Sequence, residues 1–263
     1  MRRALFLAAC LLTLGLHAVG TTAQAQATAA DKQRRLLAAY PDTLARAEGN
    51  EIVFKDGRRL PFDDGRAAKD FDTLLKTADI EDMFAIAYPK GPPVAPPALN
   101  EDPGRIRNEA FFKTMYGDCT KGEVAKNLVD VVWLPRKAGT RVQMTRINGA
   151  ADRLAAVSAE LDALPDHFTK FLTPLGGTYH CRPIAGETRL STHSYGIAID
   201  IAVAHSHYWR WTRPGTDGRY AYRNTIPWEI AAIFEKHGFI WGGKWYHYDT
   251  MHFSYRPEML PGK

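Results

Sequence analysis

A proline-rich stretch near residue 90 divides the chain into two unequal parts. It reads YPKGPPVAPP over residues 88–97 and contains five prolines. Proline lacks a backbone N–H and fixes φ, so it continues neither a helix nor a central strand. The stretch therefore predicts a linker or an extended strap. We expect a small N-terminal region over residues 26–100 and a larger domain over residues 101–263.

The first 25 residues have the three parts of a secretory signal peptide. Arg2 and Arg3 precede an apolar run over residues 4–16, and AQA at residues 23–25 supplies a small-x-small cleavage site. The run is shorter than the roughly 20 residues that span a bilayer. We expect a periplasmic or secreted protein with no integral membrane segment once the leader is removed. A lipoprotein box ending at Cys10 and a twin-arginine signal are weaker alternatives.

Composition and charge narrow the class further. Hydrophobic residues make up 45% of the 263 residues and charged residues 24%, which is typical of a folded globular protein. The net charge of +5 falls by two when the leader is removed, and no block of basic residues remains. We therefore expect no nucleic-acid partner.

Two cysteines, Cys119 and Cys181, remain after the leader. An even number of cysteines in an oxidising compartment favours a disulfide. Two separate buried thiols are the alternative, because the sequence does not show whether the two Cα atoms lie within reach of each other.

Hydrophobic periodicity predicts an α+β fold, with helices packed on a mostly antiparallel sheet and a small N-terminal α/β-hairpin region. Helices are expected over residues 29–47 with a break near Pro41, and over 67–75, 105–115, 150–164 and 227–238. A hairpin around Asp56-Gly57 is expected over residues 51–62. Further strands are expected over residues 128–134, 140–147, 177–184 and 195–203, and on both sides of Gly242-Gly243 within residues 240–255.

Two short motifs offer metal ligands. His193 and Asp200 lie seven residues apart, with Asp200 at the end of a short apolar strand, where an unpaired carboxylate would cost several kcal/mol. Asp249 and His252 lie three apart, and such residues face opposite sides of a strand. If both serve one site, Asp249 must lie in the turn just before a strand that begins near His252.

Two histidines and one carboxylate suit zinc with an open fourth position. His193, Asp200 and His252 would then bind the metal, which lowers the pKa of a bound water toward about 7. Asp249, a carboxylate beside the metal, would take the proton of that water. Nine histidines in the chain also produce such spacings by chance, so spacing alone leaves the hypothesis open.

Three separated blocks of sequence resemble the peptidase M15 family of zinc D-alanyl-D-alanine carboxypeptidases, dipeptidases and L-alanyl-D-glutamate endopeptidases. They are Arg182 with LSTHSYGIAIDI at residues 190–201, GFIWGGKW at 238–245 and DTMHF at 249–253. The Trp-Gly-Gly stretch and the aspartate at position 249 are most similar to the endolysin-type branch. The resemblance implies a single zinc site in an M15-like domain over residues 101–263.

The resemblance also implies a role for each residue of the motif. His193, Asp200 and His252 correspond to the zinc ligands, Asp249 to the general base, and Arg182 to the arginine that stabilises the oxyanion. Arg189 is the rival for that last role. Ser191 is expected to orient its loop or to contact substrate, rather than to act as a nucleophile, which would need an oriented base.

The other histidines and aromatic residues near these motifs are interpreted without a direct role in metal binding. His205 and His207 are an alternative metal pair, but a loop position is expected for both. His247 is expected to be solvent-facing or to support the site. Trp241, Trp245 and Tyr248 belong either to the core or to the walls of a substrate groove, and Trp245 is our choice for the groove.

The resulting hypothesis is an exported zinc metallopeptidase that acts on peptidoglycan stem peptides or cross-bridges. The substrate class depends on the family resemblance and on the leader. One alternative is a zinc-containing binding protein on the same fold with little or no peptidase activity. Another is a peptidase for small peptides unrelated to the cell wall.

Overall fold

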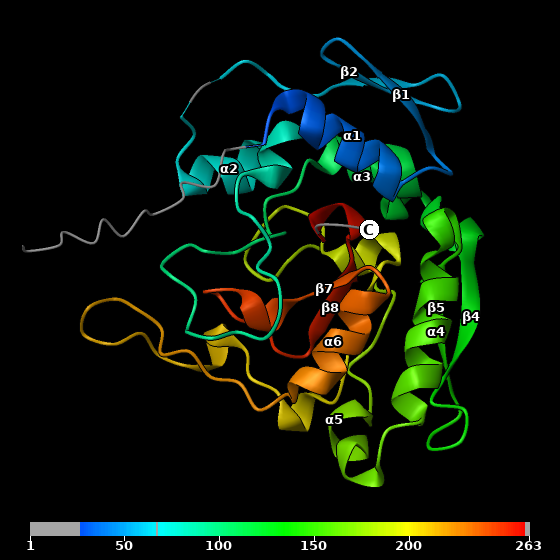
Figure 1. The fold of residues 1–263 in the computed structure, drawn as a ribbon, viewed down its shortest axis with the longest axis vertical. Coiled ribbons are helices and arrows are strands. Elements are labelled where there is room, and N and C mark those ends of the chain that lie inside the picture. The colour runs from blue at the N-terminus through cyan, green and yellow to red at the C-terminus, as the bar shows by residue number, and fades with distance from the viewer. Residues whose placement is uncertain (1–26, 67, 261–263) are drawn as a thin grey trace, which may run out of the picture.

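The computed structural model describes residues 27–66 and 68–260, and the predicted leader lies outside these ranges. In the described part, six α-helices pack with small antiparallel sheets (Figure 1), which confirms the α+β class. The strands form three separate sheets, of three, two and three strands, rather than the single sheet expected. Within the same ranges, every helix is too short or too polar to span a bilayer.

The N-terminal region contains a helix and a three-stranded sheet. Thr28 caps helix α1 (Ala29–Ala39) in a capping box with Asp31. The helix ends before Pro41, as predicted, but the expected continuation to residue 47 is wrong, because the chain there forms β1 (Leu44–Glu48). The hairpin is confirmed as β2 (Glu51–Phe54) and β3 (Arg59–Pro61), and β2 also pairs with β1. Helix α2 (Phe71–Thr77) follows.

The second sheet is an antiparallel pair covered by a helix. Strands β4 (Leu128–Trp133) and β5 (Thr140–Thr145) pair along their whole lengths, and α4 (Ala150–Asp162) packs against them (Figure 1). The short helix α5 (Thr169–Leu172) follows α4. Strands β4 and β5 and helix α4 lie close to their predicted positions, whereas α5 was not predicted. Helix α3 (Glu109–Tyr116) begins four residues later than expected, since Asn108 is its N-cap and accepts from the Phe111 N–H at 2.7 Å.

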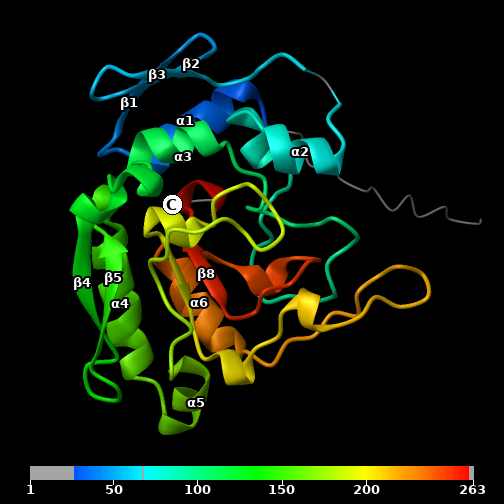
Figure 2. The ribbon, with the colours of Figure 1, turned by 180° about the vertical axis from the view of Figure 1, so that it is seen from behind.

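The third sheet lies at the centre of the molecule (Figure 2) and has the order β6-β8-β7. Its strands are β6 (Ala198–Asp200), β7 (Phe239–Trp241) and β8 (His252–Tyr255), and helix α6 (Trp228–Lys236) packs on it. The rings of Phe234 in α6 and Phe253 in β8 stack at 3.8 Å. The register pairs Asp200 with His252. The strand expected over residues 177–184 is wrong, because Gly177 and Pro183 form isolated bridges only.

The proline-rich stretch is an extended strap held against the third sheet. The Tyr88 hydroxyl accepts from the Trp241 N–H at 2.9 Å and donates to Glu235 at 2.5 Å, while the Lys244 ammonium donates to the Pro89 carbonyl at 2.8 Å. One hydrophobic core contains residues from both sides of the strap, such as Leu36 and Phe112. A domain boundary near residue 100 stays a prediction.

A disulfide joins Cys119 to Cys181, whose Cα atoms lie 5.7 Å apart, so the paired alternative is confirmed. It closes a loop of 62 residues. We expect the C119A/C181A double variant to lower the free energy of unfolding by roughly 3–4 kcal/mol, since the unfolded chain regains the entropy of the open loop. Urea unfolding of this variant and of the oxidised wild type measures the difference. An unchanged midpoint would contradict a stabilising role for the bridge.

Candidate metal centre

Three residues from two separate parts of the sequence meet where β6 ends and β8 begins. His193 lies in a tight turn over Thr192–Tyr195, which starts at Ser191 and ends at Gly196 with a φ of +65°. The Ser191 hydroxyl accepts from the backbone N–H of His193 at 3.4 Å, so Ser191 orients the loop. Asp200 ends β6 and His252 begins β8 directly opposite it. The turn and the strand register therefore place all three side chains together.

The ligand atoms of these side chains lie within bonding distance of a common point. His193 Nε2 is 3.3 Å from His252 Nδ1 and 3.2 Å from Asp200 Oδ1, and the last two atoms are 2.9 Å apart. A tetrahedral ion with bonds of about 2.0–2.1 Å separates its ligand atoms by about 3.3 Å. The group can therefore hold a metal ion. Among the described residues, the other groups of possible ligands contain carboxylates only.

The remaining ring nitrogen of His193 fixes the tautomer that metal binding needs, and the partner of the remaining His252 nitrogen is compatible with it. His193 Nδ1 lies against the backbone carbonyl of Thr178, which only accepts, so the proton is on Nδ1 and Nε2 is free to bind a cation. His252 Nε2 lies 3.1 Å from the Thr192 hydroxyl. With a proton on Nε2 donated to Thr192, His252 Nδ1 is free in the same way.

Electrostatics also match a cation at this position. Burial opposes ionisation of Asp200, but the two imidazoles outweigh it and hold the pKa of this carboxyl well below its usual range. Burial lowers the pKa of His252, which favours the neutral imidazole that binds metals. For His193, burial is outweighed by the charge of Asp200, so its pKa is raised.

Asp249 lies in the turn that precedes β8, as the sequence predicted. The His252 N–H donates to the Asp249 carbonyl at 3.1 Å, and a bridge to Tyr208 holds the other side of the turn. Asp249 Oδ1 is buried and has no hydrogen-bond partner within the described chain. Burial and the charge of Asp200 raise the pKa of Asp249 to about 7. A cation nearby would lower this pKa again, because positive charge favours the carboxylate.

A cleft of about 270 Å³ opens over the three ligands. Besides them and Asp249, it is lined by Ser191, Thr192, Met251, Arg182, Arg105, Arg107, Ile184, Ala185, Tyr208, Trp211 and Trp245. Trp245 therefore forms a wall, with its ring 5.6 Å from that of His252. Arg182 lines the cleft, whereas its rival Arg189 pairs with Glu187 at 2.5 Å outside it.

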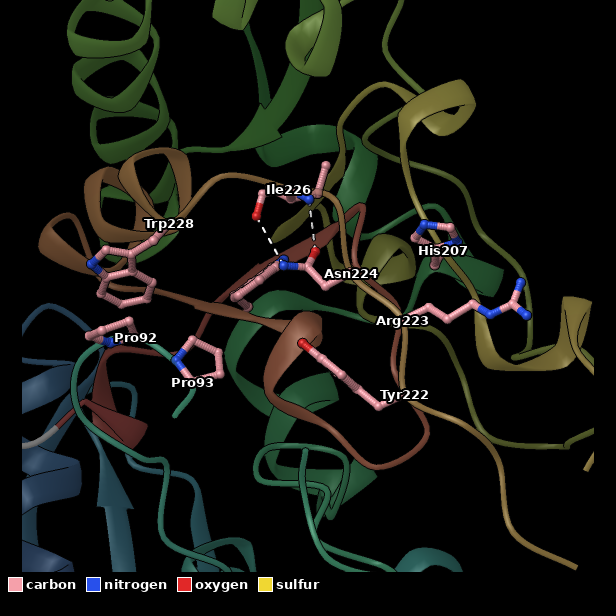
Figure 3. A pocket seen from close by; sticks show the side chains of 9 residues that line it. Pro92, Pro93, His207, Tyr222, Arg223, Asn224, Ile226 and Trp228 are labelled. Carbon is pink, nitrogen blue, oxygen red and sulfur yellow. Dashed lines mark hydrogen bonds between the residues drawn. The ribbon is translucent and has the colours of Figure 1, made fainter. Parts of the chain in front are cut away.

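The other candidate residues lie elsewhere. His207 borders a second cavity of about 600 Å³, with Pro92, Pro93 and Trp228 on its opposite side (Figure 3), and no carboxylate or thiol is found among the described residues that line it. His205 packs against Phe171. His247 lies outside the cleft lining and its ring pairs with the buried Asp102, which also accepts from the His247 backbone N–H at 2.9 Å. Trp241 and Tyr248 belong to the core.

Arg105 and Arg107 are cleft residues that the sequence reasoning missed. Arg105 and Arg107 stand in a segment expected to be helical, and no motif distinguishes them from surface arginines. Only the N-cap at Asn108, which ends the loop, was a possible signal that this segment is not helical.

The comparison with protein families defines the class. The model of a D-alanyl-D-alanine carboxypeptidase family, Peptidase_M15_4, matches residues 185–255. The segment therefore carries a peptidase domain of the M15 type, which confirms the resemblance found in the sequence. His193, Asp200, Asp249 and His252 all lie inside it, and Arg182 lies just outside. No curated protein matches the chain.

Proposed function

We propose that this protein is an exported zinc metallopeptidase that hydrolyses peptide bonds in peptidoglycan stem peptides or cross-bridges. The convergence of His193, Asp200 and His252 within the segment of M15 type is the observation that carries this proposal. The family description supports a substrate that contains D-alanine. The predicted leader supports a location outside the cytoplasm.

The residues of the cleft fit amide hydrolysis. The chemistry expected from a bound zinc ion is polarisation of the scissile carbonyl and acidification of a nearby water. Asp249, which lacks a partner for one oxygen, accepts the proton of the attacking water and returns it to the leaving amine. Arg182 donates to the carbonyl oxygen as this atom becomes negative. Trp245 and Tyr208 line the space in which the peptide lies.

The test is the release of products from purified muropeptides, followed by mass spectrometry. We expect cleavage with zinc present, loss of at least about 100-fold after removal of the metal with a chelator, and recovery when zinc is returned. Release of D-alanine, or of a stem fragment, also identifies the scissile bond.

Two histidine variants sharpen the experiment. His193→Ala removes a ligand and should lose both bound zinc and activity, whereas His207→Ala is a matched control outside the cleft and should keep both. Equal turnover in chelated and zinc-loaded protein would reject the proposal. Tight zinc binding without cleavage of any muropeptide would favour a binding protein, and cleavage of free dipeptides alone would favour a peptidase unrelated to the cell wall.

A further inference from the structure

Three arginines share the wall of the metal cleft. Arg182 precedes the matched segment, and Arg105 and Arg107 come from the loop before α3, about 80 residues earlier in the chain. The described carboxylates of the cleft are Asp200 and Asp249. Three guanidinium groups against two carboxylates leave the cleft positive even before a cation is added, so it attracts anions.

These guanidinium groups are poorly neutralised by the protein. Within the described ranges, Arg107 and Arg182 form no ion pair, and their side chains donate to the carbonyls of Leu190 at 3.0 Å and of Pro183 at 3.3 Å. Arg105 Nε is buried without a hydrogen-bond partner, and the nearest oxygen of Asp102 is 3.8 Å away. By contrast, Arg189 has Glu187 as a close partner.

Arg105 is also held in place before any ligand arrives. Its guanidinium lies 4.8 Å from the centre of the Trp245 ring and donates to the His247 carbonyl at 2.7 Å. The backbone N–H of His247 in turn donates to the buried Asp102 at 2.9 Å. Because few rotamers remain to be fixed, an anion that binds here loses little affinity to side-chain ordering.

The Arg107 guanidinium is destabilised by burial and by neighbouring positive charges. Burial and the neighbouring charges of Arg189 and Arg256 lower the pKa of Arg107 to about 9. An anion beside Arg107 would relieve this repulsion. The planar fork of a guanidinium matches both oxygens of a carboxylate.

We infer that Arg105 and Arg107 form a subsite for a free carboxylate of the substrate, placed within one or two residues of the scissile bond. This inference rests on the proposed function, and it adds Arg105 and Arg107 to it as residues that determine specificity. The carboxylate is placed this close to the scissile bond because Arg105, Arg107 and the three ligands line the same small cleft. The carboxylate is either the C-terminus of the peptide or the α-carboxylate of a γ-linked glutamate.

The zinc-loaded enzyme is tested on the pentapeptide L-Ala-γ-D-Glu-L-Lys-D-Ala-D-Ala, on its C-terminal amide and on its D-isoglutamine form. Blocking the recognised carboxylate should lower kcat/KM of the wild type by about 10- to 100-fold, mainly through KM. The amide form whose kcat/KM falls shows which carboxylate, the C-terminal one or that of the glutamate, is recognised. In Arg107→Met and Arg105→Met, the ratio of kcat/KM for the acid to kcat/KM for the amide should fall toward one. Arg141→Met, in β5, is the control and should keep the wild-type ratio.

A binding measurement separates failure of this inference from failure of the proposed function. Calorimetry on zinc-loaded protein compares acetyl-D-Ala-D-Ala and acetyl-γ-D-Glu-L-Lys with their amides, and Arg107→Met should weaken binding of the acid form alone. If the wild type cleaves acids and amides equally well, the carboxylate subsite is rejected while the peptidase stands. If it cleaves nothing, the peptidase is rejected, and equal binding of acids and amides then rejects the subsite as well. Thermal unfolding confirms that each variant is folded.

Discussion

Replacing Asp249 with asparagine is expected to lower turnover by about 10²- to 10⁴-fold while zinc content stays unchanged. The amide of asparagine has nearly the shape of the carboxylate but accepts no proton from water. Asp249 is not among the three residues whose ligand atoms converge, so its loss leaves the metal group intact. Steady-state kinetics on muropeptides and metal analysis of the same sample measure both quantities.

The control for this variant is Asp217→Asn, which makes the same chemical change in an exposed loop and should leave turnover at the wild-type level. Undiminished turnover in Asp249→Asn would remove the general-base role. Loss of zinc together with activity would instead make Asp249 a ligand.

The second large effect is expected in stability, at a buried ion pair that does not line the cleft. Arg256 and Glu258 are both fully buried and joined through Arg256 Nε and Glu258 Oε1. The Tyr40 hydroxyl donates to the other Glu258 oxygen, and Arg256 Nη1 donates to the Gly104 carbonyl at 2.9 Å. Burial and the charge of Glu258 raise the pKa of Tyr40, so the phenol stays protonated and donates. This cluster joins the N-terminal region to the segment that carries Arg105.

Glu258→Gln is therefore expected to lower the free energy of unfolding by about 3–5 kcal/mol, since it leaves the Arg256 charge buried without compensation. Urea unfolding followed by circular dichroism provides the measurement. Asp72→Asn breaks the exposed pair with Lys76 and serves as the control, with an expected change below about 1 kcal/mol. A Glu258→Gln variant as stable as this control would show that the cluster contributes little.

Much of the local structure followed from the sequence because the signals were local. Asp56-Gly57 predicted its hairpin, Pro41 ended α1 and the apolar spacing of residues 150–164 predicted α4. The turn at Asp249 followed from the two-residue period of a strand, since Asp249 and His252 serve one site only if one of them precedes the strand. Local spacing misled at residues 44–48, which pair with β2, and at residues 177–184, where Gly177 and Pro183 form isolated bridges only.

The sequence by itself predicted that His193, Asp200 and His252 could share a metal, with Asp249 in the turn beside them, and its motifs resembled the M15 family. Only the tertiary structure decided that Arg105 and Arg107 face the same cleft, that Cys119 reaches Cys181, and that His247 rests on Asp102. The physical reason is that periodicity reports how a residue is buried by its own element. Contacts across 60 to 150 residues depend on how separate elements pack, and no local pattern records them.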